Sequence, residues 1–189
     1  MESFKNLSDH YGTLDNQDND FRNNNLTNLL VNYVTGTSIL DVGCGTGYFL
    51  KKLSTFKKIR CYGLDPNPHM RKLHKKLNTK IKIYNLWAEE MGKIRRKFDT
   101  ISMIDVLEHI KDDTAQLKLM KNNLKNDGNL IIVVPANQWL YGKRDIAVGH
   151  YRRYSIHELR TKLKSAGYRV KMVRYWNIAG VLPYFISEK

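Results

Sequence analysis

The sequence predicts an α/β fold of the Rossmann-like class, with a doubly wound and mostly parallel sheet. Short apolar runs alternate along the chain with helical patterns, which is typical of parallel sheets covered by helices. The first apolar run ends in a glycine-rich turn at 43–47. Polar residues with useful chemistry follow several runs, and the carboxyl ends of parallel strands are where such sheets bind ligands.

The apolar runs define the expected strands and the amphipathic patterns the expected helices. Strands are predicted at 37–42, 59–65, 80–84, 98–104, 129–134 and 168–176. Helices are predicted at 48–56, 68–77, 112–124 and 155–166. Ser155 and Glu158 form a capping box for the last helix, and Gly167 suits its end. The run at 129–134 is almost wholly apolar, so we expect it to be buried within the sheet.

The chain carries a formal net charge of +14, which has two interpretations. It could reflect a polyanionic partner, such as a nucleic acid or an anionic membrane surface. Alternatively, it could reflect a Lys-rich composition without functional meaning, because the basic residues are spread along the chain and not gathered in one tract. Both interpretations stay open at this point.

Several classes of protein are disfavoured by composition. The first ten residues lack the layout of a signal peptide, and no apolar run approaches the roughly 18 residues of a membrane-spanning helix. The two cysteines, Cys44 and Cys61, form neither a disulfide framework nor a zinc-binding spacing. We therefore expect a cytoplasmic protein without a metal site.

The glycine turn gives the most specific functional indication. Its pattern is Asp41-x-Gly43-x-Gly45-x-Gly47, and glycines allow both a sharp strand-to-helix turn and a close approach of ligand to backbone. A dinucleotide fingerprint would place glycine at position 48, where this chain has Tyr48. A carboxylate at position 41 would repel a pyrophosphate. It suits a ligand with a cationic amine, such as the methionine part of S-adenosylmethionine.

A second carboxylate, Asp65, ends the second predicted strand. An acidic residue there can accept hydrogen bonds from the hydroxyls of an adenosine ribose. A strand-end or helix-capping role is the alternative for this residue taken alone. Together with the glycine turn, Asp65 favours an adenosine-bearing, cationic ligand.

At these residues the sequence resembles the class I S-adenosylmethionine-dependent methyltransferases. The segments that carry the resemblance are ILDVGCGTGYFL, CYGLDPNPHM, FDTISMIDVLEHIKDD and LKNDGNLIIVVPA, and it extends from about Ile39 to Trp176. The third of these is similar to the branch related to ubiquinone-biosynthesis methyltransferases. The resemblance implies the strand order 3-2-1-4-5-(7)-6, with S-adenosylmethionine as cofactor and S-adenosylhomocysteine as product.

The resemblance also implies roles for individual residues in cofactor binding. The turn would hold the methionine end, Asp65 the ribose, and Asp105 would lie under the transferred methyl group. The expected cofactor-binding set is Asp41, Gly43, Cys44, Gly45, Gly47, Asp65, Pro66, Trp87, Ala88, Glu89 and Asp105. Many relatives have an acidic residue where this chain has Trp87, so either stacking on the adenine or a core position would suit that side chain.

The segment from 135 to 154 resembles the substrate-facing loop of one bacterial, type 11/23-like subgroup, with a Gly-His-Tyr-Arg-Arg-Tyr motif. His109 and His150 are the candidates for a general base, since an oxygen nucleophile often requires one. The expected substrate contacts are Tyr141, Arg152, Arg153 and Tyr154. For Arg152 and Arg153 the alternative is an ion pair with Asp145.

We expect residues 1–189 to form a single methyltransferase domain. Residues 1–35 would form a helical or loop cap, 36–134 the cofactor-binding core, and 135–189 the substrate loop, helix and last strand. In the family an antiparallel seventh strand lies beside the fifth, and here only 184–187 could form a short one. The sequence therefore predicts a C-terminally truncated member with a short or missing seventh strand.

Three functions remain open. The first is methyl transfer to a small-molecule, lipid or glycan-type acceptor, with a peripheral membrane contact allowed. The second is methylation of a nucleic acid such as RNA, which is favoured by charge; the chain lacks an Asn-Pro-Pro-Tyr-like tetrad, having Ile104-Asp105-Val106-Leu107 instead. The third is a non-catalytic module that binds S-adenosylmethionine. The sequence does not define the oligomeric state.

Overall fold

The computed structural model describes residues 21–70 and 80–176. Its helices are α2 (Phe21–Val31), α3 (Tyr48–Phe56), α5 (Asp113–Asn123), α6 (Lys143–Ala147) and α7 (Ile156–Ser165), with short 3-10 helices η2 (Ala88–Lys93), η3 (Leu107–His109) and η4 (Gln138–Leu140). The strands are β1 (Ser38–Val42), β2 (Arg60–Leu64), β3 (Lys82–Tyr84), β4 (Phe98–Ile104) and β5 (Leu124–Val133). Within the described ranges, no helix is long and apolar enough to cross a bilayer.

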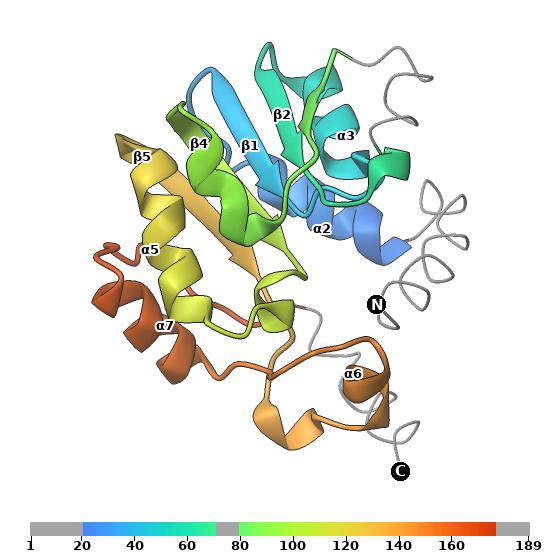
Figure 1. Ribbon diagram of the computed structural model, residues 1–189, viewed down its shortest axis with the longest axis vertical. Helices are drawn as coiled ribbons and strands as arrows, with labels where there is room; N and C mark the ends of the chain where they lie inside the picture. Colours follow the sequence, from blue (N-terminus) through green and yellow to red (C-terminus); the bar gives the residue numbers. More distant parts are fainter. Residues whose placement is uncertain (1–20, 71–79, 177–189) are drawn as a thin grey trace.

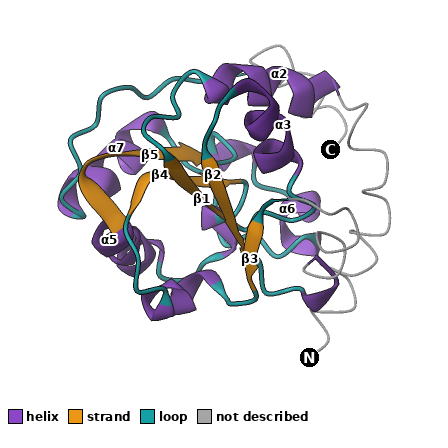
Figure 2. Ribbon diagram, turned by 90° about the horizontal axis from the view of Figure 1, so that it is seen from above, coloured by secondary structure: helices purple, strands orange, loops and turns teal. Residues whose placement is uncertain are grey.

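The strands form one parallel sheet in the order β3-β2-β1-β4-β5, which confirms that part of the predicted order. Figure 1 shows α2 and α3 on one side of the sheet and α5 and α7 on the other. Seen from above in Figure 2, the sheet lies between these two helical layers. The fold therefore has the three-layer α/β arrangement of the Rossmann-like class.

Alternation along the strands builds two cores. In β1, Ile39 packs with α2 and α3, while Leu40 packs with the layer that contains α5 and α7. All five residues of β1 are buried, because the strand lies in the middle of the sheet and both of its faces are covered. This central position fixes the carboxyl end of β1, where the glycine turn begins.

Two expectations about the far side of the sheet are wrong. Residues 168–176 form no strand, and β5 is only partly buried along most of its length. Within the described residues β5 pairs with β4 alone, so one of its edges and part of its apolar surface lie toward the 168–176 segment. Strong apolar character in a sequence therefore did not ensure burial here. The predicted strand at 184–187 and most of the predicted helix at 68–77 lie outside the described residues.

Candidate active site

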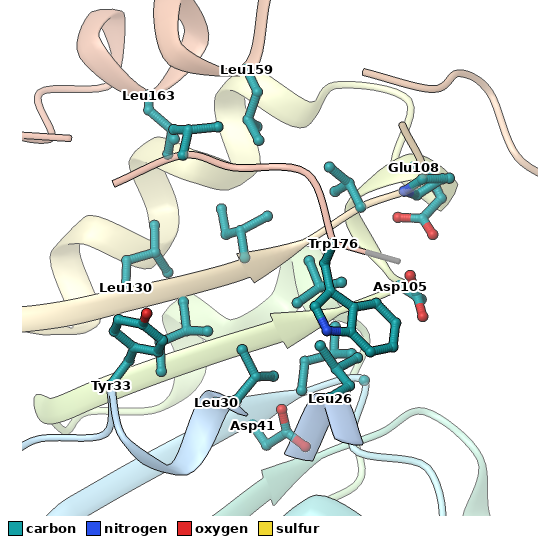
Figure 3. A pocket seen from close by; sticks show the side chains of 18 of the residues that line it. Leu26, Leu30, Tyr33, Asp41, Asp105, Glu108, Leu130, Leu159, Leu163 and Trp176 are labelled. Atoms are coloured by element: carbon teal, nitrogen blue, oxygen red, sulfur yellow. The ribbon is translucent and has the colours of Figure 1, made fainter. Parts of the chain in front are cut away.

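The crevice that could hold ligands lies at the carboxyl ends of β1 and β4. It is lined by the glycine turn, Asp105, Glu108 and apolar residues of α2, including Leu26 and Leu30. Figure 3 shows Asp41, Asp105 and Glu108 around this space, with the Trp176 indole among these side chains and above Leu26 in this view. Three carboxylates from two neighbouring strands therefore face one crevice, as the predicted strand order requires.

The glycine turn depends on backbone conformations that glycine adopts most readily. Gly43, Gly45 and Gly47 have φ values of 72°, 48° and 75°. A Cβ added to Gly43 would lie 2.3 Å from Val106 Cγ2 of the β4 loop. The Gly43 amide donates to the Leu64 carbonyl oxygen over 2.7 Å, which ties the turn to the end of β2. The turn is thus held by backbone contacts on both sides, and Cys44 within it is buried.

Asp41 is buried below this turn and accepts a 2.7 Å hydrogen bond from Ser102 Oγ of β4. Burial raises its pKa to about 7; the Ser102 hydrogen bond opposes this rise, and the charge of Asp65 adds to it. A bound cation would favour the ionised carboxylate. The electrostatics of this position therefore fit the cationic methionine end of S-adenosylmethionine.

Asp65 is also buried, and its carboxylate bonds to backbone amides. Oδ2 accepts from the Gly45 amide and Oδ1 from the Asn67 amide, each over 2.9 Å. Asp65 thus supports the glycine turn, a role that the sequence did not indicate. Its proposed contact with a ribose stays a prediction. The neighbouring Pro66 is half-buried, and its carbonyl oxygen accepts from Asn85 Nδ2.

The predicted adenine segment lies at η2, beyond β3. Trp87 is 47% exposed, so it is not the core aromatic that was one alternative. Ala88 is buried against the core. Glu89 is exposed and lines a small pocket with Ile110 and Gln116 of the α5 region. The indole is exposed, as stacking on a ligand ring requires, but Trp87 is not among the residues that line the crevice, and its role stays a prediction.

Asp105 follows β4 in a strained backbone conformation. Its φ is 51°, and its amide donates to the Val133 carbonyl oxygen of β5 over 3.0 Å. Positive φ is uncommon for residues other than glycine and often occurs at functional sites. The next turn, η3, buries Glu108 fully and leaves His109 exposed. This geometry places two carboxylates and an imidazole within five residues at the tip of one strand.

His150 is brought to this strand tip by the loop after β5. Its Nδ1 lies 2.7 Å from Asp145 Oδ1, while Nε2 lies 3.9 Å from Glu108 Oε1. The His150 and His109 rings meet edge to face, with centroids 4.6 Å apart. In the tautomer that carries its hydrogen on Nδ1, the ring donates to Asp145 and its Nε2 faces the β4 tip. The two predicted histidines, 41 residues apart in sequence, are therefore neighbours.

Asp145 accepts hydrogen bonds from several residues of this loop, and it is only 1% exposed. It receives hydrogen bonds from the Gly142 amide and from Arg153 Nε, and Arg153 Nη2 pairs with Oδ2 over 2.9 Å. Burial tends to raise the Asp145 pKa, but the hydrogen bonds from Arg153 and His150 outweigh it and hold that pKa below its usual value. Sequence reasoning considered Asp145 only as an ion-pair partner of the two arginines. No local pattern in the sequence indicated its contact with His150.

The other predicted substrate residues are engaged within the protein. Arg152 Nη1 pairs with Asp113 Oδ2 over 2.8 Å, so its carboxylate partner is Asp113 and not Asp145. Tyr154 is buried and donates to Asp113 as well, over 2.9 Å. Tyr141 donates from its hydroxyl to the His150 carbonyl oxygen. These bonds hold the loop against α5. Substrate binding by Tyr141, Arg152, Arg153 and Tyr154 stays a prediction.

One cluster could also hold a metal ion. Glu108, His109 and His150 each offer one ligand atom, and these atoms lie within 4.8 Å of one another. Two imidazoles and a carboxylate form a donor set that divalent cations accept. The sequence-based expectation of no metal site is therefore open to experiment.

Comparison with known proteins agrees with this geometry. A family profile described as "Methyltransferase domain" matches residues 17–173. The chain belongs to this methyltransferase family. Its cofactor is S-adenosylmethionine. The glycine turn and the buried carboxylates Asp41 and Asp65 are the groups expected to hold it, and that assignment stays a prediction.

Curated relatives that are similar in sequence carry the name tRNA U34 carboxymethyltransferase. A tRNA U34 carboxymethyltransferase of Campylobacter jejuni is 27% identical over 135 residues, which cover 69% of this chain and 45% of the relative. The chain therefore spans less than half the length of that relative.

Solved structures show the same fold. The YcgJ protein of Bacillus subtilis has a TM-score of 0.68 at 18% identity, covering 86% of this chain and 76% of that one. A mycolic acid cyclopropane synthase, CmaA1, solved with SAH and CTAB, has a TM-score of 0.66 at 17% identity, covering 85% and 66%.

Proposed function

We propose that this chain transfers the methyl group of S-adenosylmethionine to a small-molecule, lipid or glycan-type acceptor, with His150 as the general base. The observation that carries this proposal is the Asp145–His150 pair at the β4 tip, beside Asp105 and Glu108. A side-chain carboxylate that holds one nitrogen of an imidazole leaves the other available for proton transfer. Asp145 would act as a positioning residue, because it reaches the acceptor only through His150.

The cofactor supplies an electrophilic methyl group on a sulfonium. Asp41 and the glycine turn would bind its methionine end, Asp65 its ribose, and Trp87 with Ala88 the adenine side. A nucleophilic oxygen or nitrogen of the acceptor would form the new bond to carbon as the carbon–sulfur bond breaks. Its proton would move to His150 Nε2, and S-adenosylhomocysteine would leave as a neutral thioether. Alignment of the reacting groups supplies much of the rate enhancement in such transfers.

The cofactor part of the proposal is tested by titration with S-adenosylhomocysteine in a calorimeter. We expect micromolar binding by the wild type and loss of binding in Asp65→Ala. Asp65→Asn is the matched control. Its side-chain carbonyl oxygen can still accept one hydrogen bond, from the Asn67 amide or from the ribose, but the side chain carries no charge. An unfolding temperature close to that of the wild type must accompany the loss. Equal binding by wild type and Asp65→Ala would contradict the placement of the ribose.

RNA is the second candidate acceptor. It is favoured by the net charge of +14 and by the relatives named tRNA U34 carboxymethyltransferase. The carboxylates Asp41, Asp105 and Glu108 that line the crevice disfavour a phosphodiester close to the reacting atoms. Binding of tRNA that weakens steeply with salt, together with methyl transfer to it, would replace the small-molecule proposal.

A further inference from the structure

The loop after β5 forms a lobe that extends past the carboxyl ends of the strands. We call residues 137–151 the acceptor lobe; it contains η4 and α6 and is the lower part of the molecule in Figure 1. Three large side chains of the lobe are strongly exposed: Trp139 at 63%, Ile146 at 66% and Tyr151 at 55%. Isolated apolar residues on a surface are ordinary, whereas three within thirteen residues are a concentration of the kind that marks interaction surfaces; of the three, Ile146 also lines the crevice.

The charges of the acceptor lobe are segregated. Lys143 and Arg144 are exposed, whereas Asp145, the one acidic residue in the 137–151 sequence, is buried against Arg153 and His150. The outer surface of the lobe therefore carries cations and no carboxylate. Apolar and aromatic side chains mixed with cations are characteristic of segments that bind at the interface of anionic membranes.

A polar network links several residues of the lobe to one another. The Tyr141 hydroxyl donates to the His150 carbonyl oxygen, and the His150 amide donates to the Asp145 carbonyl oxygen over 2.8 Å. These bonds close the loop on itself around Asp145. Tyr141, Asp145 and His150 are thus tied to one another, whereas Trp139, Ile146 and Tyr151 are exposed.

We infer that the acceptor lobe docks on an anionic lipid bilayer and that the methyl acceptor is a lipid or lipid-linked molecule. The lipid acceptor rests on the proposed function, because that proposal defines the acceptor site. Docking on the bilayer does not depend on methyl transfer. Ile146 and Ala147 of the lobe line the same crevice as Asp105 and Glu108. A head group presented at the bilayer surface would therefore meet the crevice at the lobe.

The chemistry of the lobe favours lipid over RNA. Ile146 is the most exposed of the three side chains, and an aliphatic group cannot stack on a base as an aromatic ring does. The carboxylates of the crevice would repel an RNA backbone drawn toward them. A lipid acceptor whose reacting group lies apart from any phosphate brings no phosphodiester into the crevice, so the carboxylates do not oppose it.

The test is sedimentation with vesicles of phosphatidylcholine, with and without phosphatidylglycerol, in the absence of cofactor. We expect binding to the anionic vesicles that weakens with salt. Trp139→Ser with Ile146→Ser should reduce the partition coefficient at least about tenfold, since each side chain loses part of its buried area. Lys143→Ala should reduce it about fivefold, as expected for one cation near an anionic surface.

The matched control removes an equally exposed apolar side chain and a cation at the opposite end of the sheet. Phe56 is 61% exposed at the end of α3, and Lys58 is exposed just before β2. Phe56→Ser with Lys58→Ala should bind vesicles like the wild type. Retained binding of S-adenosylhomocysteine by every variant would show that the cofactor site is folded, so failure of docking is distinguished from failure of the proposed function.

The inference is overturned if the Trp139→Ser and Ile146→Ser variant partitions like the wild type, or if the control loses binding equally. It is also overturned if tRNA binds through these residues while vesicles do not. A further outcome concerns the acceptor alone. If the protein methylates a water-soluble acceptor and vesicles do not change the rate, a lipid acceptor is excluded even if docking is observed.

Discussion

The two sides of the crevice are built by different means. The cofactor side, at the ends of β1 and β2, is formed by backbone: three glycines with positive φ and amide bonds to Asp65 and Leu64. The acceptor side, at the end of β4, is formed by side chains from a distant loop, joined by the Asp145 network. One side therefore depends on conformations available to few residue types, and the other on buried charges that must remain paired.

Because the two sides of the crevice are built differently, mutations on each side should have different effects. Changes in the turn should impair cofactor binding with little effect on the acceptor loop. Changes in the Asp145 network should impair turnover or stability while the cofactor still binds. Each prediction below either separates the two sides or shows that they are coupled.

The largest expected effect is on turnover. His150→Gln should lower kcat by about 10²–10⁴, the range for loss of a general base, with unchanged binding of S-adenosylhomocysteine. Asp145→Asn should lower kcat less and disturb the tautomer of His150, which ¹⁵N shifts of the imidazole report. His157→Gln on the exposed face of α7 is the control.

A wild-type rate in His150→Gln would remove this base from the mechanism. Loss of activity on treatment with a chelator, with recovery on addition of a divalent cation, would instead assign Glu108, His109 and His150 to a metal. Under the proposed mechanism, chelators should leave the rate unchanged.

The next effect is on stability. Arg153→Met should reduce the free energy of unfolding by about 3–5 kcal/mol, because it leaves Asp145 buried without its guanidinium partner. Lys125→Met removes one cation from a more exposed pair with Asp99 and should cost less than about 1 kcal/mol. Denaturant unfolding measures both. Equal losses in the two variants would mean that the Asp145 network has no special role in the acceptor loop.

The turn should be sensitive to a single methyl group. Gly43→Ala should weaken binding of S-adenosylhomocysteine by about two orders of magnitude, through positive-φ strain together with the clash at Val106. Adding Val106→Ala should restore part of the affinity, because it removes the clash and leaves the strain. Gly92→Ala, whose Cβ would lie 3.3 Å from Leu119 Cδ1, is the control. Failure of the double variant to recover would indicate that strain alone accounts for the loss.

The smallest expected effect is a pH dependence of cofactor affinity. Since the Asp41 pKa is raised to about 7, the free protein holds a proton there below that pH. A cationic ligand favours the ionised form, so its binding should release a proton, and affinity should rise as pH increases through about 7. Calorimetry in buffers of different ionisation enthalpy detects the release. Asp41→Asn should abolish both the release and the pH dependence; their persistence would assign them to another group.

The sequence predicted most of the cofactor side because its signals are local. A strand, a glycine turn and a strand-end carboxylate lie within 28 residues, and each has a physical meaning before any fold is known. The order of the five described strands followed from the family resemblance and is confirmed. The sixth strand was wrong: residues 168–176 pair with no described strand, although β5 has an edge that is unpaired within the described residues, because an apolar alternation shows only that a strand could form and not that it pairs.

By itself, the sequence determined the fold class, the glycine turn and the pair of carboxylates beside it, because backbone conformation and strand periodicity are properties of neighbouring residues. Only the tertiary structure decided that Asp145 holds His150 against the β4 tip, and that Arg152 pairs with Asp113 while Arg153 pairs with Asp145. Which buried charges pair with one another depends on which elements pack together. The sequence does not indicate the partner of a charge when the two residues are distant along the chain. The exposure of Trp139, Ile146 and Tyr151 in the acceptor lobe likewise became visible only in the structure.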